Sequence, residues 1–402
     1  MGLLFSNGLI YSTWGVSVPI LKSKFGLSEG TLSLAMAGLA LGGIATMGQV
    51  GRWISRIGSD RASAWTAVFM ALLAAPILLV PNYAALLPLL VFYGVATAAN
   101  DVSANAQGSY LEALSQRSLI GSFHASFSIG GLAGSVLASN WSFTHLPEAA
   151  NFYLLSLLVA MTAGLSSRFL IRDAGPPNFT GGSPTAQVGE EIPMAVRKRL
   201  RVFGALAFAA LVVEGAFYDW AAVYMREVIS APDSWIGYGY AAFAIGMTTG
   251  RLSGDWIRDR LKHQVVMSGS GVLGALGLFL VISASSGLVA IIGFGVTGLG
   301  VANVIPILFS SAGKLTQAAG VAASQGLAVT TRIAYVGLLV GPLFIGPVAQ
   351  CLGLRSSLFI LTIAIVAICT GWLWLSHISG GTPWAPPTAP SNALSPTELR
   401  KV

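Results

Sequence analysis

Two short polar stretches, each following a long apolar run, decide the fold of this chain. The first reads Gly48-Gln49-Val50-Gly51-Arg52-Trp53-Ile54-Ser55-Arg56-Ile57-Gly58-Ser59-Asp60-Arg61. The second reads Gly250-Arg251-Leu252-Ser253-Gly254-Asp255-Trp256-Ile257-Arg258-Asp259-Arg260. Small glycines let helices approach closely, and clustered Arg and Asp side chains can form ion pairs at a membrane surface. The stretches therefore predict two equivalent loops, one in each half of the chain, whose ion pairs stabilise one state of a gate.

The composition places these loops in a membrane protein. Of 402 residues, 54% are hydrophobic and only 9% are charged, whereas a soluble domain carries roughly a quarter charged residues. So few charges cannot cover a globule of this size with a solvated surface. The 48 Gly and 18 Pro also fit membrane helices, in which both residues are tolerated. A soluble enzyme is excluded.

A bilayer-spanning helix needs about 20 mostly apolar residues, and the chain contains twelve such segments. The first six lie near 2–21, 31–50, 62–80, 84–108, 118–140 and 149–170, and the second six near 200–224, 235–256, 265–284, 287–312, 320–349 and 355–376. We therefore expect an all-α membrane protein with 12 transmembrane helices in two six-helix halves.

The polar stretches predict how this fold is divided. We expect an N-terminal half over 1–171, a cytoplasmic linker over 172–199, a C-terminal half over 200–379, and a disordered cytoplasmic tail over 380–402. The linker is rich in Gly, Ser and Thr and ends in three basic residues, and the tail is rich in Pro and Ser. Such compositions do not bury enough apolar surface to fold alone.

The positions of the basic residues predict the orientation. With the N-terminus inside, 17 of the 22 Lys and Arg residues fall on the cytoplasmic side, which agrees with the positive-inside rule. The net charge of +7 is thereby explained by the face that meets anionic lipid, without a nucleic-acid partner. We expect a multi-pass protein of the bacterial inner (plasma) membrane with both termini in the cytoplasm.

The two halves also resemble each other in sequence. Gly51-Arg52-Trp53-Ile54 pairs with Gly254-Asp255-Trp256-Ile257, and Ala99-Asn100 pairs with Ala302-Asn303, both at an offset of 203 residues. Gly130 and Gly134 pair with Gly337 and Gly341 at an offset of 207. Three matches in corresponding segments indicate a repeat, which is typical of transporters that bind substrate between two halves.

The two polar loops, the segment count and the linker together resemble the major facilitator superfamily over the whole chain. The resemblance implies the major facilitator fold, function as a single chain, and a cavity lined by helices one, four, seven and ten. It also implies gating roles for the loop residues Gly51, Arg52, Arg56, Gly58, Arg251, Asp255 and Arg258. Ser55 stands where the family usually has an acid, which leaves the usual latch of the N-terminal half in doubt.

Three further stretches resemble a narrower branch. Residues 101–107, 123–131 and 214–220 are similar to the YbjJ-like bacterial branch, which is itself similar to fucose permease-type sugar–proton symporters. The fourth segment lacks the Arg, and the fifth lacks the Pro, that are typical of proton-driven drug antiporters. Both absences favour uptake over efflux.

Carboxylates at membrane depth are costly and suggest a function. We expect proton-coupling roles for Asp101, Glu214 and Asp219, because a carboxyl group in a partly dry cavity changes its proton affinity when the cavity opens. The alternative is a fixed ion pair, for instance between one of these acids and Arg332.

The uncharged polar residues suggest the substrate. Amides that bond hydroxyls, beside aromatic rings that stack on a sugar face, would form a sugar-like site. The candidates are Tyr11, Trp14, Asn100, Asn105, Gln107, Tyr218, Trp220, Asn303 and Gln325, with Arg332 as a substrate clamp or charge partner. The alternative is that the amides cross-link helices and the aromatic residues form interfacial belts.

These observations favour proton-coupled symport of a small polar solute, a sugar or related metabolite, with the proton gradient as the energy source. Proton-coupled efflux of a drug or metabolite is the alternative. A membrane enzyme is disfavoured because the four His occur without an HExxH or Gly-x-Ser-x-Gly motif. A channel is disfavoured because it would need a continuous polar lining, whereas the two-half repeat favours gating around a single site. We expect no metal site and no cofactor.

Overall fold

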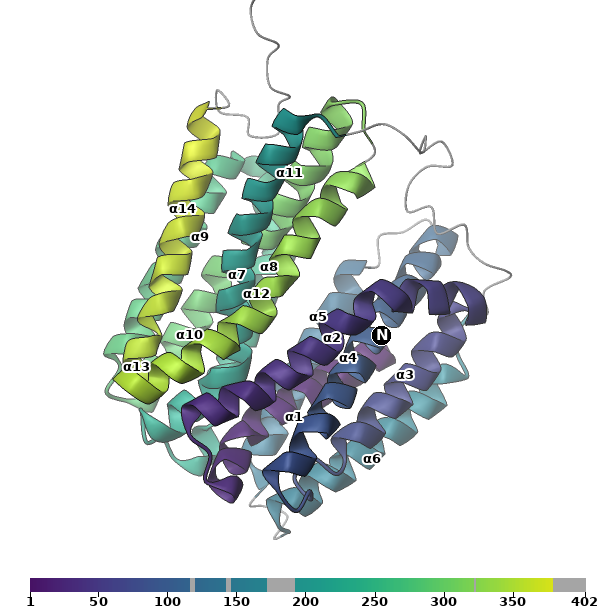
Figure 1. Cartoon of the computed structure of the whole chain (residues 1–402), viewed down its shortest axis with the longest axis vertical. Coiled ribbons are helices and arrows are strands. Elements are labelled where there is room, and N and C mark those ends of the chain that lie inside the picture. Colours follow the sequence, from purple (N-terminus) through teal and green to yellow (C-terminus); the bar gives the residue numbers. More distant parts are fainter. Residues whose placement is uncertain (116–119, 142–145, 172–191, 322, 379–402) are drawn as a thin grey trace, which may run out of the picture.

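The computed structural model describes residues 1–115, 120–141, 146–171, 192–321 and 323–378. Within these ranges the regular structure is helical (Figure 1). The N-terminal half contains α1 (Gly2–Phe25), α2 (Glu29–Ile57), α3 (Ser59–Ala74), α4 (Tyr83–Ser115), α5 (Ile120–Ser139) and α6 (Glu148–Ser167). The C-terminal half contains α7 (Met194–Glu227), the short 3-10 helix η2 (Asp233–Trp235), α8 (Tyr238–Arg260), α9 (His263–Ser283), α10 (Gly287–Val301), α11 (Val304–Ala318), α12 (Ala323–Leu352), α13 (Leu354–Ser357) and α14 (Phe359–Ile378).

Every predicted segment overlaps a helix, and the third, tenth and twelfth differ in detail: α3 ends at Ala74, before the predicted end at 80. The tenth segment is interrupted at Ala302 and Asn303 and forms α10 and α11, and the twelfth forms α13 and α14. In the described residues, seven helical stretches are long and apolar enough to cross a membrane. They are Tyr83–Gly108, Glu148–Ser167, Met194–Glu227, His263–Ser283, Gly287–Ala318, Gln325–Leu352 and Leu354–His377. The all-helical membrane fold is therefore confirmed, while the full count of twelve crossings stays a prediction.

The predicted linker is shorter than expected at its C-terminal end. Helix α7 begins at Met194, so residues 194–199 belong to the helix. The basic residues there do not prevent this, because Arg and Lys are good helix formers. Residues 172–191 and the predicted tail, 380–402, lie outside the described residues.

The tight turn between α1 and α2 shows how local sequence fixes the helix ends. Gly26 closes α1 in the left-handed conformation, with φ 60°, which glycine adopts without steric cost. Ser28 then begins α2, and its side chain accepts a hydrogen bond from the backbone N–H of Thr31. A serine cap of this kind satisfies one of the free donors in the first helical turn.

Glycine contacts confirm the internal repeat. A side chain at Gly130 or Gly134 of α5 would collide with the carbonyl oxygens of Phe5 or Leu9 of α1. In the C-terminal half, Gly337 and Gly341 of α12 meet the carbonyl oxygens of Phe208 and Val212 of α7 in the same way. The contacted residues are related by an offset of 203 (5 to 208 and 9 to 212), so α1–α5 and α7–α12 are equivalent helix pairs.

The two halves lie side by side and touch mainly through the helix pairs α1–α7, α2–α12 and α5–α8 (Figure 1). We call the end of the bundle where α6 ends and α7 begins the linker end, and the opposite end the far end. Contacts between the halves cluster toward the far end. There Lys22 bonds Glu227, the backbone N–H of Gly30 donates to Gln350 Oε1 over 3.2 Å, and that of Gly237 donates to Ser139 Oγ over 2.9 Å.

Candidate functional site

An ion pair inside the C-terminal half forms the centre of the candidate site. Arg251 Nη2 of α8 lies 3.1 Å from Glu214 Oε1 and 3.2 Å from Oε2 of α7. The Glu214 side chain is 12% exposed and that of Arg251 is 37% exposed, so the pair is accessible mainly from the arginine side. Glu214 was predicted to lie at membrane depth with a role in proton coupling, and the partner of its carboxylate is Arg251 rather than Arg332, which was named in the alternative.

Arg251 lies within the predicted eighth helical segment, 235–256, rather than in the loop after it. Helix α8 continues to Arg260, so Arg251 lies nine residues before its end, about 13 Å deeper at 1.5 Å per residue. Its motif therefore does not form a surface loop at this point. A guanidinium at this depth needs an anionic partner, and Glu214 on the neighbouring helix provides it.

Tyrosines connect this ion pair to the N-terminal half. Tyr218 lies one helical turn beyond Glu214 on α7, and its side chain interacts with the Glu214 carboxylate. The Tyr218 ring packs edge-on against Tyr11 of α1, with centroids 6.2 Å apart, and lies 5.2 Å from the ring of Tyr240 of α8. Tyr11 and Tyr218 are both half-buried. The predicted pair of Tyr11 and Tyr218 thus meets at the boundary between the halves.

Two further acids lie around the same centre. Tyr335 of α12 is within electrostatic range of Asp101, Glu214 and Arg251. Asp101 is exposed, and its side chain accepts a hydrogen bond from Asn105 Nδ2 over 3.1 Å. Asp219 is half-buried and lies within electrostatic range of Tyr11 and Tyr240. The structure therefore groups all three predicted acids near tyrosines.

The predicted amides behave differently, because most of them cross-link helices. Asn100 Nδ2 of α4 donates to Asn7 Oδ1 of α1, and Asn100 Oδ1 accepts from Thr66 of α3 over 3.2 Å. Gln107 accepts from Ser59 and donates to the carbonyl oxygen of Ile171 over 2.9 Å. Their hydrogen-bonding groups are thus engaged by protein, which favours the alternative that these amides cross-link helices, while substrate binding by either residue stays a prediction.

Asn303 plays the equivalent part in the C-terminal half. Its Nδ2 donates to the Gly250 carbonyl oxygen over 3.0 Å, and its Oδ1 accepts from Arg258 Nη1 over 3.0 Å. Asn303 lies at the interruption between α10 and α11, where backbone groups lose their helical partners. Asn303 therefore links α8 to the junction between α10 and α11, and one of its two bonding partners on α8 is Arg258, a predicted gating residue.

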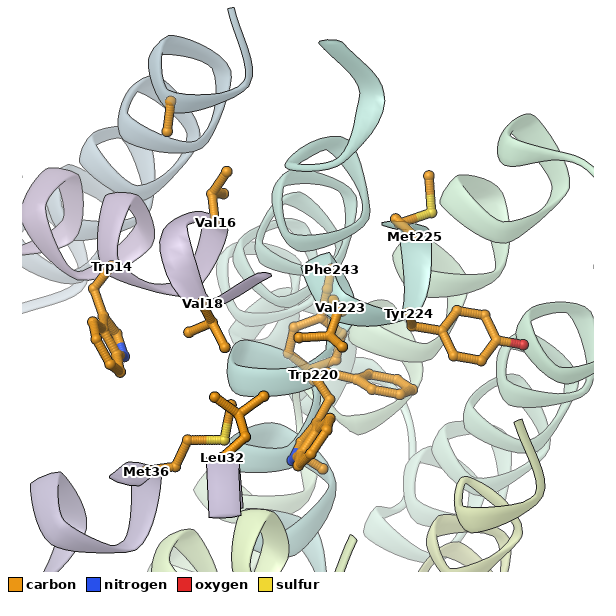
Figure 2. Close-up of a cluster of buried hydrophobic side chains, with 14 of the residues drawn as sticks. Trp14, Val16, Val18, Leu32, Met36, Trp220, Val223, Tyr224, Met225 and Phe243 are labelled. Carbon is orange, nitrogen blue, oxygen red and sulfur yellow. The ribbon is translucent and has the colours of Figure 1, made fainter. Parts of the chain in front are cut away.

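Both tryptophans proposed to bind substrate are fully buried. Trp14 is 1% exposed and Trp220 is 0% exposed, and both belong to the largest apolar core. Figure 2 shows them on either side of Val18, Leu32 and Met36, within the region where α1, α2 and α7 pack together. In this structure both side chains pack within the core, and their contact with substrate stays a prediction.

The remaining predicted residues lie at or toward the linker end. Gln325 is half-buried and Arg332 is exposed, both on α12. Gly51 and Arg56 are exposed on α2, and Gly58, with φ 90°, separates α2 from α3. The side chains of Arg52 and Asp255 lie outside the described set.

Two tyrosines of the site, Tyr240 and Tyr335, were not predicted. Tyr240 lies on α8, and Tyr335 is three residues beyond Arg332 on α12. Spacing from Arg332 was the signal that could have identified Tyr335.

A separate cavity of about 260 Å³ lies at the linker end of the N-terminal half. Its lining is mostly apolar and comes from α1, α4, the end of α6 and the residues after it, including Leu4, Leu111, Ser166 and Phe169. It contains none of the acids or tyrosines described above. We therefore do not place the candidate site there.

Comparisons with known proteins agree with this architecture. The family model described as Major Facilitator Superfamily matches residues 1–332. The chain is 32% identical over 373 residues to an uncharacterized MFS-type transporter of Yersinia pestis, covering 90% of this chain and 92% of that one. It is 29% identical to the membrane protein MosC of Rhizobium meliloti, covering 94% of this chain and 89% of that one.

Solved structures show the same fold. A mutant of the nucleoside transporter NupG has a TM-score of 0.75 at 13% identity, covering 93% of this chain and 98% of that one. A bacterial homologue of the human lysosomal transporter Spinster, solved in an inward-facing and occupied conformation, has a TM-score of 0.70 at 14% identity, covering 93% and 95%.

Proposed function

Because this chain belongs to the Major Facilitator Superfamily of secondary transporters, we propose that it moves a small polar solute, a sugar or related metabolite, together with protons. The transported species would be the solute and the proton, and the proton gradient would supply the energy without a cofactor. The single observation that carries the proposal is the Glu214–Arg251 ion pair at the centre of the site.

The ion pair suits proton coupling for an electrostatic reason. While Glu214 is ionised, Arg251 neutralises it at a depth where an isolated charge is costly. Protonation of Glu214 would remove half of that pair and release the guanidinium to bind solute. An opening that hydrates the pair would return the proton. A carboxyl group whose environment changes in this way transfers protons as the protein changes conformation.

The surrounding tyrosines support a hydroxylated solute. Tyr11 and Tyr218 meet at the boundary between the halves, and each offers a ring face and a hydroxyl group. A tyrosine hydroxyl both donates and accepts hydrogen bonds, which matches sugar hydroxyls. Nearby Asp101 and Asn105, on the N-terminal half, would face the solute from the other side.

The transport cycle would proceed by alternating access, in which the two halves rock around the site so that it opens to one side of the membrane at a time. The halves are bonded at the far end, so the site would be reached from the linker end in this state. The distribution of basic residues assigns the linker end to the cytoplasm, and the protein similar to Spinster was solved facing inward. We therefore assign this structure to an inward-facing state of an inner-membrane protein that works as a monomer, with both termini in the cytoplasm.

The experiment is reconstitution into liposomes with an imposed pH gradient and a panel of radiolabelled sugars, polyols and nucleosides. Accumulation of a solute in the direction of proton flow supports symport. Loss of preloaded solute against the direction of proton flow would instead establish proton-coupled efflux. Absence of any pH-dependent flux would contradict proton coupling.

A further inference from the structure

A carboxyl group without a partner lies between the Glu214–Arg251 ion pair and the far end. Asp219 of α7 is half-buried, and among the described residues its side chain makes no hydrogen bond or ion pair. It is five residues beyond Glu214 and eight before Glu227 on the same helix, about 7.5 Å from the first and about 12 Å from the second along the axis. An unpaired carboxylate at membrane depth is costly, so Asp219 is suited to hold a proton.

Two tyrosines connect Asp219 with Glu214. The first is Tyr11 of α1, whose hydroxyl lies within electrostatic range of Asp219 and, more weakly, of Tyr218. The rings of Tyr11 and Tyr218 are in edge-on contact, with centroids 6.2 Å apart. Tyr218 in turn donates a hydrogen bond to the Glu214 carboxylate, as expected for a helical side chain that leans back over the residue one turn before it. The contacts therefore lead from Asp219 through two hydroxyl groups to the ion pair.

Two further tyrosines lie around these groups. Tyr240 of α8 is within electrostatic range of Asp219, and its ring lies 5.2 Å from that of Tyr218. Tyr93 of α4 is within electrostatic range of Tyr11 and Tyr240. A tyrosine hydroxyl donates and accepts hydrogen bonds at once, so it can pass a proton on without becoming charged itself.

We propose that two tyrosine hydroxyls, those of Tyr11 and Tyr218, relay a proton from Asp219 to the ion pair, and that this relay is connected only while the far end is closed. The inference rests on the proposed proton coupling and names the path of the proton. In the transfer the O–H bond of Asp219 breaks and its proton goes to the Tyr11 hydroxyl. That hydroxyl passes its own proton to Tyr218, which passes its own to a Glu214 oxygen. Both tyrosines stay neutral, the negative charge moves to Asp219, and Arg251 loses its ionised partner.

The dependence on conformation follows from the helices that carry these groups. Asp219, Tyr218 and Glu214 belong to α7, whereas Tyr11 belongs to α1 of the other half, and α1 and α7 are in contact across the boundary. When the halves separate at the far end, Tyr11 would leave the other three groups, and Asp219 would take a proton from the far side. Closure would reconnect the relay only after access to the far side is lost. Protons would therefore not cross without the conformational change.

The test records transient currents after a pH jump in oriented proteoliposomes without solute, so that it reports proton movement alone. For a jump on the far side, Tyr11→Phe and Asp219→Asn should each slow the current about 100-fold, the lower end of what a positioned proton-transfer group contributes. A jump on the linker side, which reaches Glu214 directly, should give currents that change much less. Equilibrium protonation of Glu214, followed by its infrared carboxyl band, should stay as in the wild type in Tyr11→Phe, because a relay sets a rate.

Tyr224→Phe is the matched control. Tyr224 is also a buried tyrosine of α7, but its hydroxyl donates to the Val281 carbonyl oxygen over 2.8 Å within the C-terminal half. Its loss should lower thermal stability and leave the far-side current at the wild-type rate. Tyr240→Phe tests a path that stays inside the C-terminal half, and it should slow the current less than Tyr11→Phe does.

Three results would overturn the relay and leave proton coupling intact, given a pH-dependent current in the wild type. The first is a wild-type rate in Tyr11→Phe or in Asp219→Asn. The second is a slower current in Tyr240→Phe than in Tyr11→Phe, which would place the path within one half. The third is equal slowing from both sides of the membrane, or the same slowing by Tyr224→Phe. A wild type without any pH-dependent current would contradict the proposed function itself, and the relay with it.

Discussion

Lys22 of α1 and Glu227 of α7 join the two halves at the far end, with Lys22 Nζ 2.6 Å from Glu227 Oε2. The same ammonium group lies 3.0 Å from Glu29 Oε1 at the start of α2. The Lys22 side chain is only 11% exposed, so these two carboxylates replace much of the water around its ammonium group. The pair therefore stabilises the state in which the far end is closed.

Loss of this ion pair should shift the protein toward the state that is open at the far end. We expect Lys22→Ala to change the ratio of the two states about threefold to fivefold, because a partly exposed pair contributes up to about 1 kcal/mol. Distances between spin labels at the far ends of α2 and α12 would report the shift.

Lys24→Ala is the matched control for that measurement. Lys24 Nζ donates to the carbonyl oxygens of Leu78 and Val80 over 2.7 and 2.8 Å, all within the N-terminal half. Its loss should lower stability without moving the halves. Equal distance distributions for Lys22→Ala and the wild type would show that the ion pair does not hold the far end.

The fold was largely predictable because glycine spacing and apolar length are local properties. Gly130, Gly134, Gly337 and Gly341 indicated a repeat, and the structure gives each the same backbone contact across a helix pair. The interruption at Ala302 and Asn303 could not be predicted, since the residues on both sides remain apolar. It depends on Asn303 bonding to α8, which is a tertiary contact.

These glycines should be sensitive to any added side chain. We expect Gly134→Ala to destabilise the protein by about 1–3 kcal/mol, the usual cost of overpacking, because the methyl group would meet the Leu9 carbonyl and Ser12. Gly269→Ala on α9 has nothing within 4 Å of the added carbon and should be neutral or slightly stabilising. Thermal unfolding in detergent measures both, and equal stabilities would refute the close contact.

The site was less predictable than the fold because it depends on how helices are rotated against one another. Glu214 and Arg251 were both identified as candidates, but their pairing requires that α7 and α8 turn these faces together. Asn100 and Trp220 could have faced either a cavity or a neighbouring helix, since their side chains suit both environments. Sequence therefore indicated the residue types, and packing decided their roles.

The reassignment of Asn100 can be tested directly. Asn100→Ala should lower stability by about 1 kcal/mol, a typical value for an interhelical hydrogen bond in a membrane, because Asn7 and Thr66 would lose their partner. The KM for solute should stay within about twofold of the wild type, a change well below the value of one hydrogen bond. Asn105→Ala, which removes a bond only within α4, should affect stability less. A large KM increase with normal stability would return Asn100 to the binding site.

The role of Glu214 in proton coupling is tested by measuring pH-gradient-driven accumulation by Glu214→Gln in proteoliposomes, beside counterflow exchange without a gradient. We expect this variant to lose gradient-driven accumulation and to retain exchange, because the amide cannot carry the proton. Glu148→Gln, at the exposed start of α6, should behave as the wild type. Full gradient-driven accumulation by Glu214→Gln would contradict the assignment of Glu214 as the proton-coupling residue.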